Sequence, residues 1–326
     1  MSQPEPESIL ITGGSGYIGH SLVSILSGRG AHIRRMIRPG KATTAPVNPD
    51  VEDVTGDARN RADLERCLED VDTVFHFASQ TSVYAANEDP PSDLAANAAP
   101  LLNMLEICRA RKTTTRILFA GTVTQTGIPV RLPVDESHPD NPVTVYCMHK
   151  LLAEFYLKHY TRICGVRGAA LRLANVYGPG PESSSADRGI LNMMIRKALK
   201  GETLRIYGKG DFLRDYIFIE DVARAFALAA ERPEEVNGRH FVISSGTGHT
   251  LAQSINLAAD RVALRTGKRV EIEHVDPPAS LSPIETRNFI GDPSAFSKAT
   301  GWRPSVTLQE GIDRTIDFFM QPKDTP

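Results

Sequence analysis

The sequence predicts an α/β protein built on a doubly wound parallel sheet. Short apolar runs alternate with helical patterns through the first half of the chain, and a glycine-rich turn joins the first run to the first helix. Apolar runs return in the second half, after a looser stretch. Strands that alternate with helices form a parallel sheet with both faces covered. Right-handed connections then wind the sheet in both directions from its centre.

The length and spacing of the apolar residues give the individual elements. The expected strands are Ser8–Thr12, Ala31–Ile37, Asp53–Thr55, Asp72–Phe77, Arg116–Ala120 and Arg167–Leu173. Two later runs, Tyr216–Ile219 and His240–Ser244, are expected to rejoin the same sheet. Helices are expected from Ile18 to the glycines at 28 and 30, and over about 92–111, 143–165, 251–266 and 305–319. A loop rich in Pro, Gly and Ser is expected at Gly178–Asp187.

The composition is that of an ordinary globular protein. Of 326 residues, 41% are hydrophobic and 23% charged, and the net charge is −2. Nucleic-acid and membrane-surface binding both need a basic patch, which this balance does not favour. No apolar run approaches a membrane span, and no signal peptide is visible. Four scattered cysteines lack metal-like spacing, so we expect a cytoplasmic protein with no metal site.

The segment ILITGGSGYIGH carries the first functional motif. Gly13, Gly16 and Gly19 follow a strand and open a helix, which is the context of a Rossmann dinucleotide-binding turn. Glycines permit the tight turn and close approach of the backbone to a pyrophosphate, and the helix N-terminus offers free N–H groups. We expect Gly13, Gly16, Tyr17, Ile18 and Gly19 to bind NAD or NADP.

The end of the second strand bears on the choice of cofactor. An NAD site usually has an acidic residue there for the ribose 2′-hydroxyl. This chain has Ile37 and then Arg38, and an arginine suits the 2′-phosphate of NADP. The sequence therefore favours NADP over NAD. Asp57, just past the third strand, is expected to meet the adenine ring, with Ala58 beside it.

Tyr146 and Lys150 form a Y-x-x-x-K pair on the helix expected over 143–165. Residues four apart share a helical face, which places the lysine ammonium near the phenol. A phenol has a pKa of about 10 and becomes a base near pH 7 only where a cation favours the phenolate. Thr122 follows the strand RILFA at the edge where open α/β sheets bind ligands. Its hydroxyl is placed to hold a substrate oxygen while Tyr146 moves the proton.

These motifs resemble the extended short-chain dehydrogenase/reductase family, in its nucleotide-sugar epimerase/dehydratase branch. The resemblance covers nearly the whole chain. The segments that carry it are Thr12–Gly19 (TGGSGYIG), Gly56–Asn60 (GDARN), His76–Val83 (HFASQTSV), Asn97, the AGT ending at Thr122, Tyr146–Lys150 (YCMHK), Leu171–Gly180 (LRLANVYGPG), Leu204–Ala223 and Gly301–Ile312 (GWRPSVTLQEGI).

The resemblance implies a role for each matching residue. Tyr146 would be the acid/base, Lys150 its activator and ribose anchor, and Thr122 the group that orients the substrate oxygen. Cofactor contacts would come from Phe77, Ala78, Ser79, Asn97, Leu173 and Ala174. Substrate contacts would come from Thr124 and, at the diphosphate of a nucleotide sugar, from Asn175, Arg214 and Arg287. The alternative for Arg214 is a surface ion pair with Asp215 or Asp211.

Two departures from the family pattern narrow the expected reaction. Sugar 4,6-dehydratases typically place Asp-Glu after the threonine, where this chain has Val123 and Thr124. The family's usual V-Y-G is here Gln125–Gly127 (QTG). The missing acidic residue after the second strand also departs from a typical NAD-retaining 4-epimerase, but the overall sequence pattern favours a 4-epimerase that works through a 4-keto intermediate. An NADPH-dependent 4-ketoreductase of a 4-keto-6-deoxy sugar is the alternative, and a 4,6-dehydratase or a non-catalytic dinucleotide sensor is disfavoured.

The resemblance also implies an arrangement of lobes and subunits. Residues 1–174, about 215–246 and about 285–292 would form the dinucleotide-binding domain. About 175–214, 247–284 and 293–326 would form a smaller, interleaved α/β substrate lobe. The helices over 92–111 and 143–165 carry more apolar residues than one sheet contact needs. The residues in question are Leu101, Leu102, Leu105, Leu151, Leu152 and Phe155. A thick buried core is one explanation of these residues. The resemblance implies the other, a homodimer in which these helices form a four-helix bundle.

Overall fold

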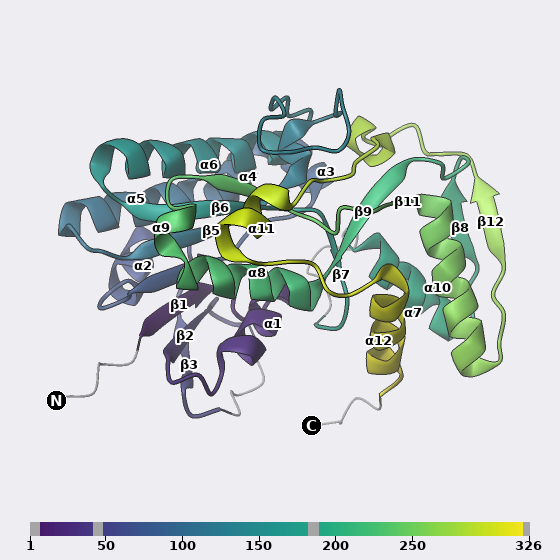
Figure 1. Cartoon of the computed structure of the whole chain (residues 1–326), viewed down its shortest axis with the longest axis horizontal. Coiled ribbons are helices and arrows are strands. Elements are labelled where there is room, and N and C mark those ends of the chain that lie inside the picture. The colour runs from purple at the N-terminus through teal and green to yellow at the C-terminus, as the bar shows by residue number, and fades with distance from the viewer. Residues whose placement is uncertain (1–6, 42–47, 182–188, 322–326) are drawn as a thin grey trace.

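A seven-stranded parallel sheet lies at the centre of the larger lobe, and a smaller lobe of helices and short strands lies beside it (Figure 1). The computed structural model describes residues 7–41, 48–181 and 189–321. The strands in this part of the chain are β1 (Ser8–Thr12), β2 (His32–Ile37), β3 (Val51–Thr55), β4 (Thr73–His76), β5 (Arg116–Thr122), β6 (Arg167–Leu173), β7 (Asn175–Tyr177), β8 (Leu204–Tyr207), β9 (Leu213–Phe218), β10 (His240–Ile243), β11 (Gly248–Thr250) and β12 (Ile272–Val275).

Helices connect and cover these strands. The helices are α1 (Tyr17–Leu26), α2 (Arg61–Cys67), α3 (Val83–Glu88), α4 (Pro90–Asn97), α5 (Ala99–Arg111), α6 (Val145–Cys164), α7 (Ile190–Lys200), α8 (Ile219–Glu231), α9 (Pro233–Val236), α10 (Leu251–Thr266), α11 (Ser294–Thr300) and α12 (Leu308–Met320). Two short 3₁₀ helices, η1 (Val123–Thr126) and η2 (Pro283–Thr286), complete the described elements.

The large sheet is doubly wound, as the sequence predicts. Its strand order is β10-β6-β5-β4-β1-β2-β3, so the chain begins near the middle and builds outward in both directions. Helices α1, α8 and α11 cover one face, and α2, α5 and α6 cover the other (Figure 1). The carboxyl ends of all seven strands point to one edge, which is where such sheets bind ligands.

Side-chain alternation along the strands builds two separate cores. Ile9 and Ile11 of β1 pack into the core under α1 and α8, whereas Leu10 packs into the core under α2, α5 and α6. Leu118 of β5 joins the first core and Phe119 the second. Successive residues of a strand point to opposite faces, so a strand buried on both sides is apolar throughout. This is why the central strands could be recognised as unbroken apolar runs.

The smaller lobe has its own core. A three-stranded sheet, β11-β9-β7, and a two-stranded pair, β12-β8, are packed by α7, α10 and α12 (Figure 1). The core is formed by Leu191, Ile195, Ile206, Ile255 and Ile312, together with neighbouring apolar side chains. Helices α7 and α10 each end at a glycine with positive φ, Gly201 and Gly267. Such glycines close a helix without steric cost.

One strand of the expected large sheet lies elsewhere. His240–Ser244 does rejoin it, since β10 pairs with β6. The prediction for Tyr216–Ile219 was wrong, because β9 pairs with β7 and β11 in the small sheet. Apolar alternation shows that a strand is buried but does not say which sheet it joins. The lobe boundaries set by sequence remain a prediction.

The helix expected over 92–111 is two helices. α4 ends at Asn97, Ala98 is a turn residue with a φ of −111° and a ψ of −43°, and α5 begins at Ala99. Pro100 explains the break, because proline has no N–H to donate to a carbonyl in the preceding turn. The loop expected at Gly178–Asp187 is described only as far as residue 181.

The two edges of the large sheet are β3 and β10. Along β10 the segment that follows η1 runs beside the strand. The Glu136 carboxylate accepts a hydrogen bond of 2.8 Å from the Val242 amide, and Val134 forms an isolated parallel bridge to Gly291. These contacts cover part of the β10 edge.

Candidate active site

The glycine turn, Gly13–Gly19, joins β1 to α1 at the ligand-binding edge. Gly13 has a φ of +71°, and a Cβ there would lie 2.9 Å from the Ala78 nitrogen. A Cβ on Gly19 would lie 2.4 Å from the Gly13 carbonyl oxygen. The N-cap of α1, Gly16, makes no side-chain hydrogen bond to the first turn. The helix therefore presents unsatisfied N–H groups over a surface that only glycine allows, and this fits a pyrophosphate.

Tyr17 connects the glycine turn to the smaller lobe. Its hydroxyl donates to the Gly178 carbonyl at 2.8 Å and accepts from Asn192 Nδ2 at 3.0 Å. Burial raises the pKa of this phenol, so it stays protonated. The side chain of Tyr17 thus connects the two lobes, and Tyr17 is also the first residue of α1.

The end of β2 is basic. Arg38 is exposed directly after the strand. Arg35 is a buried residue of β2. It forms a bidentate ion pair with Asp53 of β3, with Nε–Oδ1 and Nη2–Oδ2 distances of 2.6 and 2.9 Å. Sequence reasoning missed this pair, although Arg35 and Asp53 lie directly opposite in the parallel ladder.

Asp57 lies past β3, as predicted. Its carboxylate is held by Arg59, with an Nη2–Oδ2 distance of 2.6 Å and a further bond from the Arg59 amide at 2.9 Å. The Arg59 hydrogen bonds lower the pKa of Asp57 against the opposing effect of burial. The side chain is therefore ionised near neutral pH and able to accept a donor such as an adenine amine. Ala58 is buried beside it.

A hydrogen-bonded chain continues from the end of β4. Ser79 donates to Asn97 Oδ1, and Asn97 Nδ2 donates to Asp93 Oδ1 at 2.8 Å. Asp93 Oδ2 lies 2.7 Å from Nδ1 of His149, the residue before Lys150. Asp93 and Asn97 are each 1% exposed. Two predicted cofactor residues are thus linked to helix α6 through Asp93 and His149, which the sequence analysis missed.

We use the term catalytic edge for Thr122, Thr124, Tyr146 and Lys150. Thr122 ends β5 and caps η1, and its hydroxyl lies 2.9 Å from that of Thr124. All four residues are less than 9% exposed. Helix α6 packs against both β5 and η1, which brings the first turns of α6 to the end of β5.

Lys150 lies against the sheet. Its Nζ is 4.3 Å from the centroid of the Phe119 ring, three residues before Thr122. His76 stacks on Phe119, with 5.8 Å between the ring centroids, and its Nδ1 lies 2.7 Å from the Thr12 hydroxyl. Burial, reinforced by the charge of Lys150, lowers the pKa of His76 to about 3. His76 is therefore neutral near pH 7.

The remaining cofactor positions lie at the same edge. Phe77 and Ala78 follow β4, and Leu173 and Ala174 end or follow β6, both 7% exposed. A Cβ on Gly13 would come within 3.2 Å of the Phe77–Ala78 backbone, which places this segment directly against the glycine turn. These predicted residues therefore surround one region at the carboxyl ends of β1, β4 and β6.

The predicted substrate residues lie on the lobe side of that region. Asn175 opens β7, and its Oδ1 is buried with no hydrogen-bond partner among the described residues. Arg214 is 4% exposed and donates to the carbonyls of Leu213, Glu285 and Arg287. The alternative of a surface ion pair for Arg214 is wrong, since Asp215 bonds to Ser245, Gly246 and Gly291 instead.

Arg214 and Arg287 occupy one buried corner. Arg287 is 6% exposed and donates to the Ile284 carbonyl, while Arg214 bonds to the backbone on either side of Thr286. β9 and the turn around η2 are thus tied together by guanidinium groups. Burial lowers the pKa of Arg214, yet an arginine remains charged at neutral pH.

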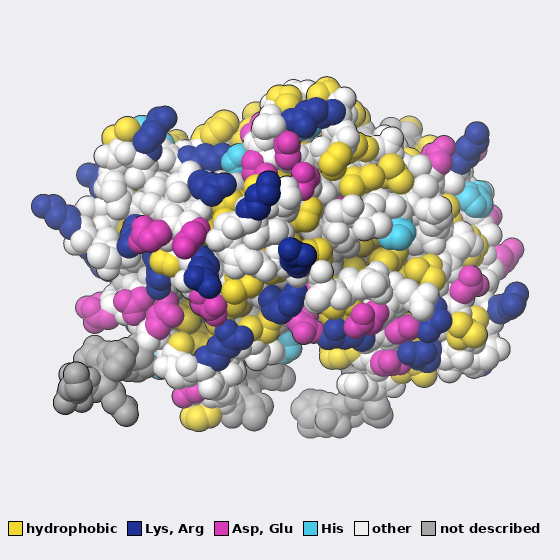
Figure 2. All heavy atoms as spheres, in the orientation of Figure 1, with side chains coloured by type: hydrophobic (Ala, Val, Ile, Leu, Met, Phe, Trp, Pro, Cys, Tyr) yellow, Lys and Arg dark blue, Asp and Glu magenta, His cyan; other side chains and the backbone are white. Residues whose placement is uncertain are grey.

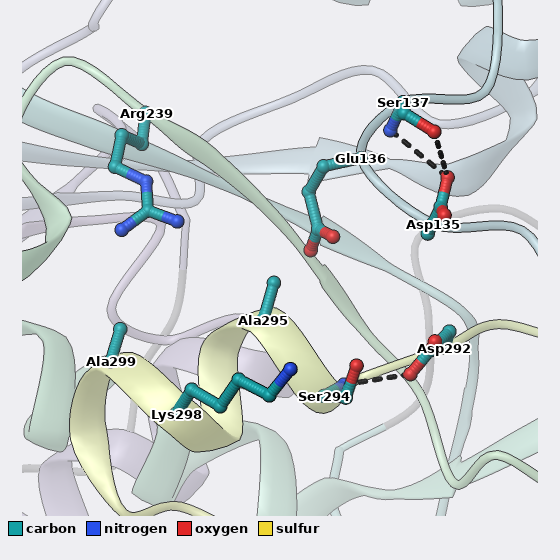
Figure 3. Close-up of a pocket in the computed structure, with 9 residues that line it drawn as sticks. All are labelled: Asp135, Glu136, Ser137, Arg239, Asp292, Ser294, Ala295, Lys298 and Ala299. Carbon is teal, nitrogen blue, oxygen red and sulfur yellow. Dashed lines mark hydrogen bonds between the residues drawn. The ribbon is translucent and has the colours of Figure 1, made fainter.

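A cavity of about 510 Å³ lies away from this region, on the flank of β10 (Figure 3). Acidic and basic side chains face it, among them Glu136, Arg239, Asp292 and Lys298. None of the predicted site residues lines it. The position of the catalytic edge at the strand ends, and not the size of this cavity, therefore locates the candidate site.

The described residues offer neither a metal site nor a membrane span. Residues 7–41, 48–181 and 189–321 contain no cluster of three or more His, Cys, Asp or Glu side chains that could hold a metal ion. In the same part of the chain, no helix combines the length and apolarity needed to span a membrane. Basic and acidic side chains are interspersed over the face shown in Figure 2.

Comparisons with known proteins agree with the fold and the motifs. Residues 9–244 match the model of the NAD dependent epimerase/dehydratase family. The UDP-glucose 4-epimerase of Thermotoga maritima, solved with UDP-glucose, is 28% identical, with a TM-score of 0.85 over 96% of this chain and 98% of that one. The enzyme of the same name from Thermus thermophilus, solved with NAD, is 30% identical, with a TM-score of 0.84 over 97% and 99%.

A reductase is also among the relatives. The GDP-6-deoxy-D-mannose reductase of Pseudomonas aeruginosa is 29% identical over 94% of this chain and 95% of its own length. Together with the glycine turn and the strand order, these similarities confirm the resemblance found in the sequence. The chain belongs to the NAD-dependent epimerase/dehydratase family and is a nucleotide-sugar-modifying enzyme of the extended short-chain dehydrogenase/reductase type.

Proposed function

We propose that this protein is a nucleotide-sugar 4-epimerase that oxidises and re-reduces a hexose carbon. The observation that carries the proposal is the buried catalytic edge: Tyr146 and Lys150 lie on α6, which packs against β5 and η1, and Thr122 ends β5. Two of the solved relatives are UDP-glucose 4-epimerases. Among the predicted residues, these three have the chemistry that moves a hydroxyl proton.

Each residue has one task in the proposed reaction. A nicotinamide cofactor, which the glycine turn of Gly13, Gly16 and Gly19 would hold, would supply the acceptor and donor of the hydride at the sugar carbon. Tyr146 takes the proton of the hydroxyl on that carbon and later gives it back. The ammonium of Lys150 favours the phenolate form of Tyr146, and the Thr122 hydroxyl holds the reacting oxygen.

The diphosphate of the substrate is assigned to the smaller lobe. Arg214 and Arg287 supply permanent positive charge, and a guanidinium binds phosphate oxygens in a bidentate manner. Asn175 adds a buried amide oxygen that lacks a protein partner among the described residues. A hydroxyl or N–H of the nucleotide sugar would satisfy it, since unpaired buried polar atoms are costly.

The cofactor preference is assigned to Arg38. It stands exposed after β2, at the place where NAD-binding proteins of this fold carry an acidic residue. We therefore propose that NADP binds more tightly than NAD. Because Arg38 favours NADP, an NADPH-dependent 4-ketoreductase is the second candidate function, and the reductase relative is consistent with it.

Two incubations separate the two candidates, one with a UDP-sugar alone and one with NADPH and a 4-keto sugar nucleotide. Purified protein is mixed with UDP-glucose or UDP-galactose, without added cofactor, and the sugars are followed by NMR. Interconversion supports the epimerase. Oxidation of NADPH by a 4-keto sugar nucleotide, with no interconversion, would overturn it in favour of the reductase. A dinucleotide sensor would bind cofactor and show neither reaction.

A homodimer through α5 and α6 is part of the proposal. Three large side chains of α6, Met148, Phe155 and Ile163, are 51%, 52% and 63% exposed. Their spacing of seven and eight residues places them on one side of the helix. Leu101, Leu105 and Leu151, by contrast, are buried within the chain. Sedimentation at micromolar concentration should give twice the chain mass, and Phe155→Asp should return it to the monomer value.

A further inference from the structure

A buried polar network lies beneath Thr122, between η1, α6 and β6. Its centre is Gln125, which is 0% exposed. The Gln125 Oε1 accepts a hydrogen bond of 3.0 Å from the Thr122 amide, and its Nε2 donates to Glu154 Oε2 at 2.9 Å. Since the Thr122 amide is a donor and the Glu154 carboxylate an acceptor, only one orientation of the Gln125 amide satisfies both.

Glu154 anchors this network to α6. It is 0% exposed and lies one helical turn after Lys150 and two after Tyr146. Arg172 of β6 forms a bidentate ion pair with the Glu154 carboxylate, with Nε–Oε2 and Nη2–Oε1 distances of 2.8 Å each. Burial would raise the pKa of Glu154, but the hydrogen bonds and charge of Arg172 outweigh it and hold the pKa at about 2. The carboxylate is thus a permanent acceptor for Gln125.

The surrounding backbone leaves room for this arrangement. Gly121 pairs with Arg172 in the β5–β6 ladder, and a Cβ on Gly121 would lie 3.1 Å from Gln125 Oε1 and 3.4 Å from Arg172 Cγ. Arg172 also binds Asp140, at 2.6 and 2.8 Å, and so ties in the segment that follows η1. Gln125 itself opens the QTG segment of the sequence.

We propose that Gln125 is a positioning residue that sets the Thr122 hydroxyl at a fixed place relative to Tyr146. Its amide joins the backbone of Thr122 to the carboxylate of Glu154, and Glu154 belongs to the same helix as Tyr146 and Lys150. The Glu154–Arg172 pair is complete without Gln125, so the amide adds a connection between η1 and α6. Small displacements between reacting groups lower turnover strongly, which is why such a connection matters. The inference rests on the proposed role of Thr122.

The test is a kinetic double-mutant cycle with Gln125→Met and Thr122→Ala. Methionine keeps the length of the side chain and removes both hydrogen bonds. We expect Gln125→Met to lower kcat about 10-fold with little change in KM for the sugar nucleotide, because misplacement of the reacting oxygen acts on the chemical step. In the Thr122→Ala background, the same substitution should change kcat less than twofold.

Thr115→Val is the matched control. It removes a buried hydrogen bond of 2.7 Å, from Thr115 Oγ1 to the Val71 carbonyl, at the other end of β5. It should lower the melting temperature without changing kcat. If Gln125→Met leaves kcat unchanged, or lowers it equally with and without the Thr122 hydroxyl, Gln125 has only a structural role.

A second variant keeps the test valid if Gln125→Met does not fold. Gln125→Glu faces the Glu154 carboxylate and can donate to it only when protonated. We expect kcat of this variant to fall as pH rises through the pKa of the new carboxyl, whereas the wild type has no such limb. An unshifted pH profile would contradict the inference. If Thr122→Ala itself has no effect, the proposed role of Thr122 fails instead.

Discussion

The glycine turn and the catalytic edge lie at the same side of one sheet but are built by different means. The turn is made of backbone, and a Cβ at Gly13 or Gly19 would overlap neighbouring main-chain atoms. The catalytic edge is made of buried side chains, and two of them, Thr122 and Thr124, are joined by a hydrogen bond. The turn should therefore fail when an atom is added, and the edge when an atom is removed.

The largest effect is expected from adding one methyl group to the turn. In Gly19→Ala, the new Cβ would lie 2.4 Å from the Gly13 carbonyl oxygen, so the turn must open. We expect loss of cofactor binding, measured by NADPH fluorescence, in a chain that keeps its circular dichroism spectrum. Ser24→Ala, on the exposed side of α1, is the control and should bind normally. Cofactor binding within tenfold of the wild type would contradict the account of the turn.

Removing one oxygen from the catalytic edge should nearly abolish turnover. Tyr146→Phe deletes the hydroxyl that moves the proton, and general acid–base groups contribute about 10²- to 10⁴-fold to rates. We expect kcat to fall by about 10³-fold while the cofactor Kd stays within a factor of two. Tyr156→Phe, on the same helix, is the matched control. Unchanged turnover in Tyr146→Phe would refute the assigned role.

Acid should weaken the protein through its buried histidines. Burial first, then nearby positive charge, lowers the pKa of His76 to about 3 and that of His240 to about 4. Because both values lie below the ordinary 6.5, the folded chain binds these protons less readily than the unfolded chain. Their contribution to stability is complete above about pH 6.5 and is lost as the pH falls toward 4 and 3.

The expected loss of stability at low pH can be calculated, because a shift of one pKa unit corresponds to about 1.4 kcal/mol. At pH 5, about 1.5 units below 6.5, each histidine should cost about 2 kcal/mol of the free energy of unfolding. Urea unfolding at pH 7 and pH 5 measures this difference. His240→Gln should reduce it by about 2 kcal/mol, whereas the exposed His159→Gln should leave it unchanged. An equal free energy of unfolding at both pH values would exclude this explanation.

The smallest effect is expected at Arg38, directly after β2. Arg38→Ala removes a charge from an exposed side chain, and a hydrogen bond to a charged group is worth about 1.5–3 kcal/mol. We expect NADP to bind about 10-fold more weakly and NAD to be unaffected. Arg61→Ala, which breaks an exposed ion pair with Glu65, is the control. Equal weakening of NAD and NADP by Arg38→Ala would show that it does not read the 2′-phosphate.

The same contrast explains how much could be predicted from the sequence. Glycine spacing after an apolar strand is a local pattern, so the turn, the large sheet and their order along the chain could be read directly. Tyr146 and Lys150 are also local, four residues apart on one helix. Thr122 could be found because the end of a strand is visible in the sequence.

The rest of the site depends on residues far apart in the chain. Gln125 meets Glu154, and Asp93 meets His149, 56 positions later. A signal was present in the sequence, since Arg172 is a charged residue near the end of an otherwise apolar run and Glu154 falls on the buried face of a helix. Buried charges are normally paired, but the pattern does not name the partner. The sheet to which β9 belongs could not be predicted for a similar reason, because its partner strands are set by tertiary packing.

The contact of Glu136 along β10 affects how this edge of the sheet can meet other protein chains. The edge of a sheet is a template on which a second chain can add a strand, and such additions start aggregates. In this chain the Val242 amide already donates to a carboxylate, and the Val134–Gly291 bridge occupies the adjoining stretch. A strand that approached β10 would have to displace a charged side chain before it could pair, which protects the protein against self-association at this edge.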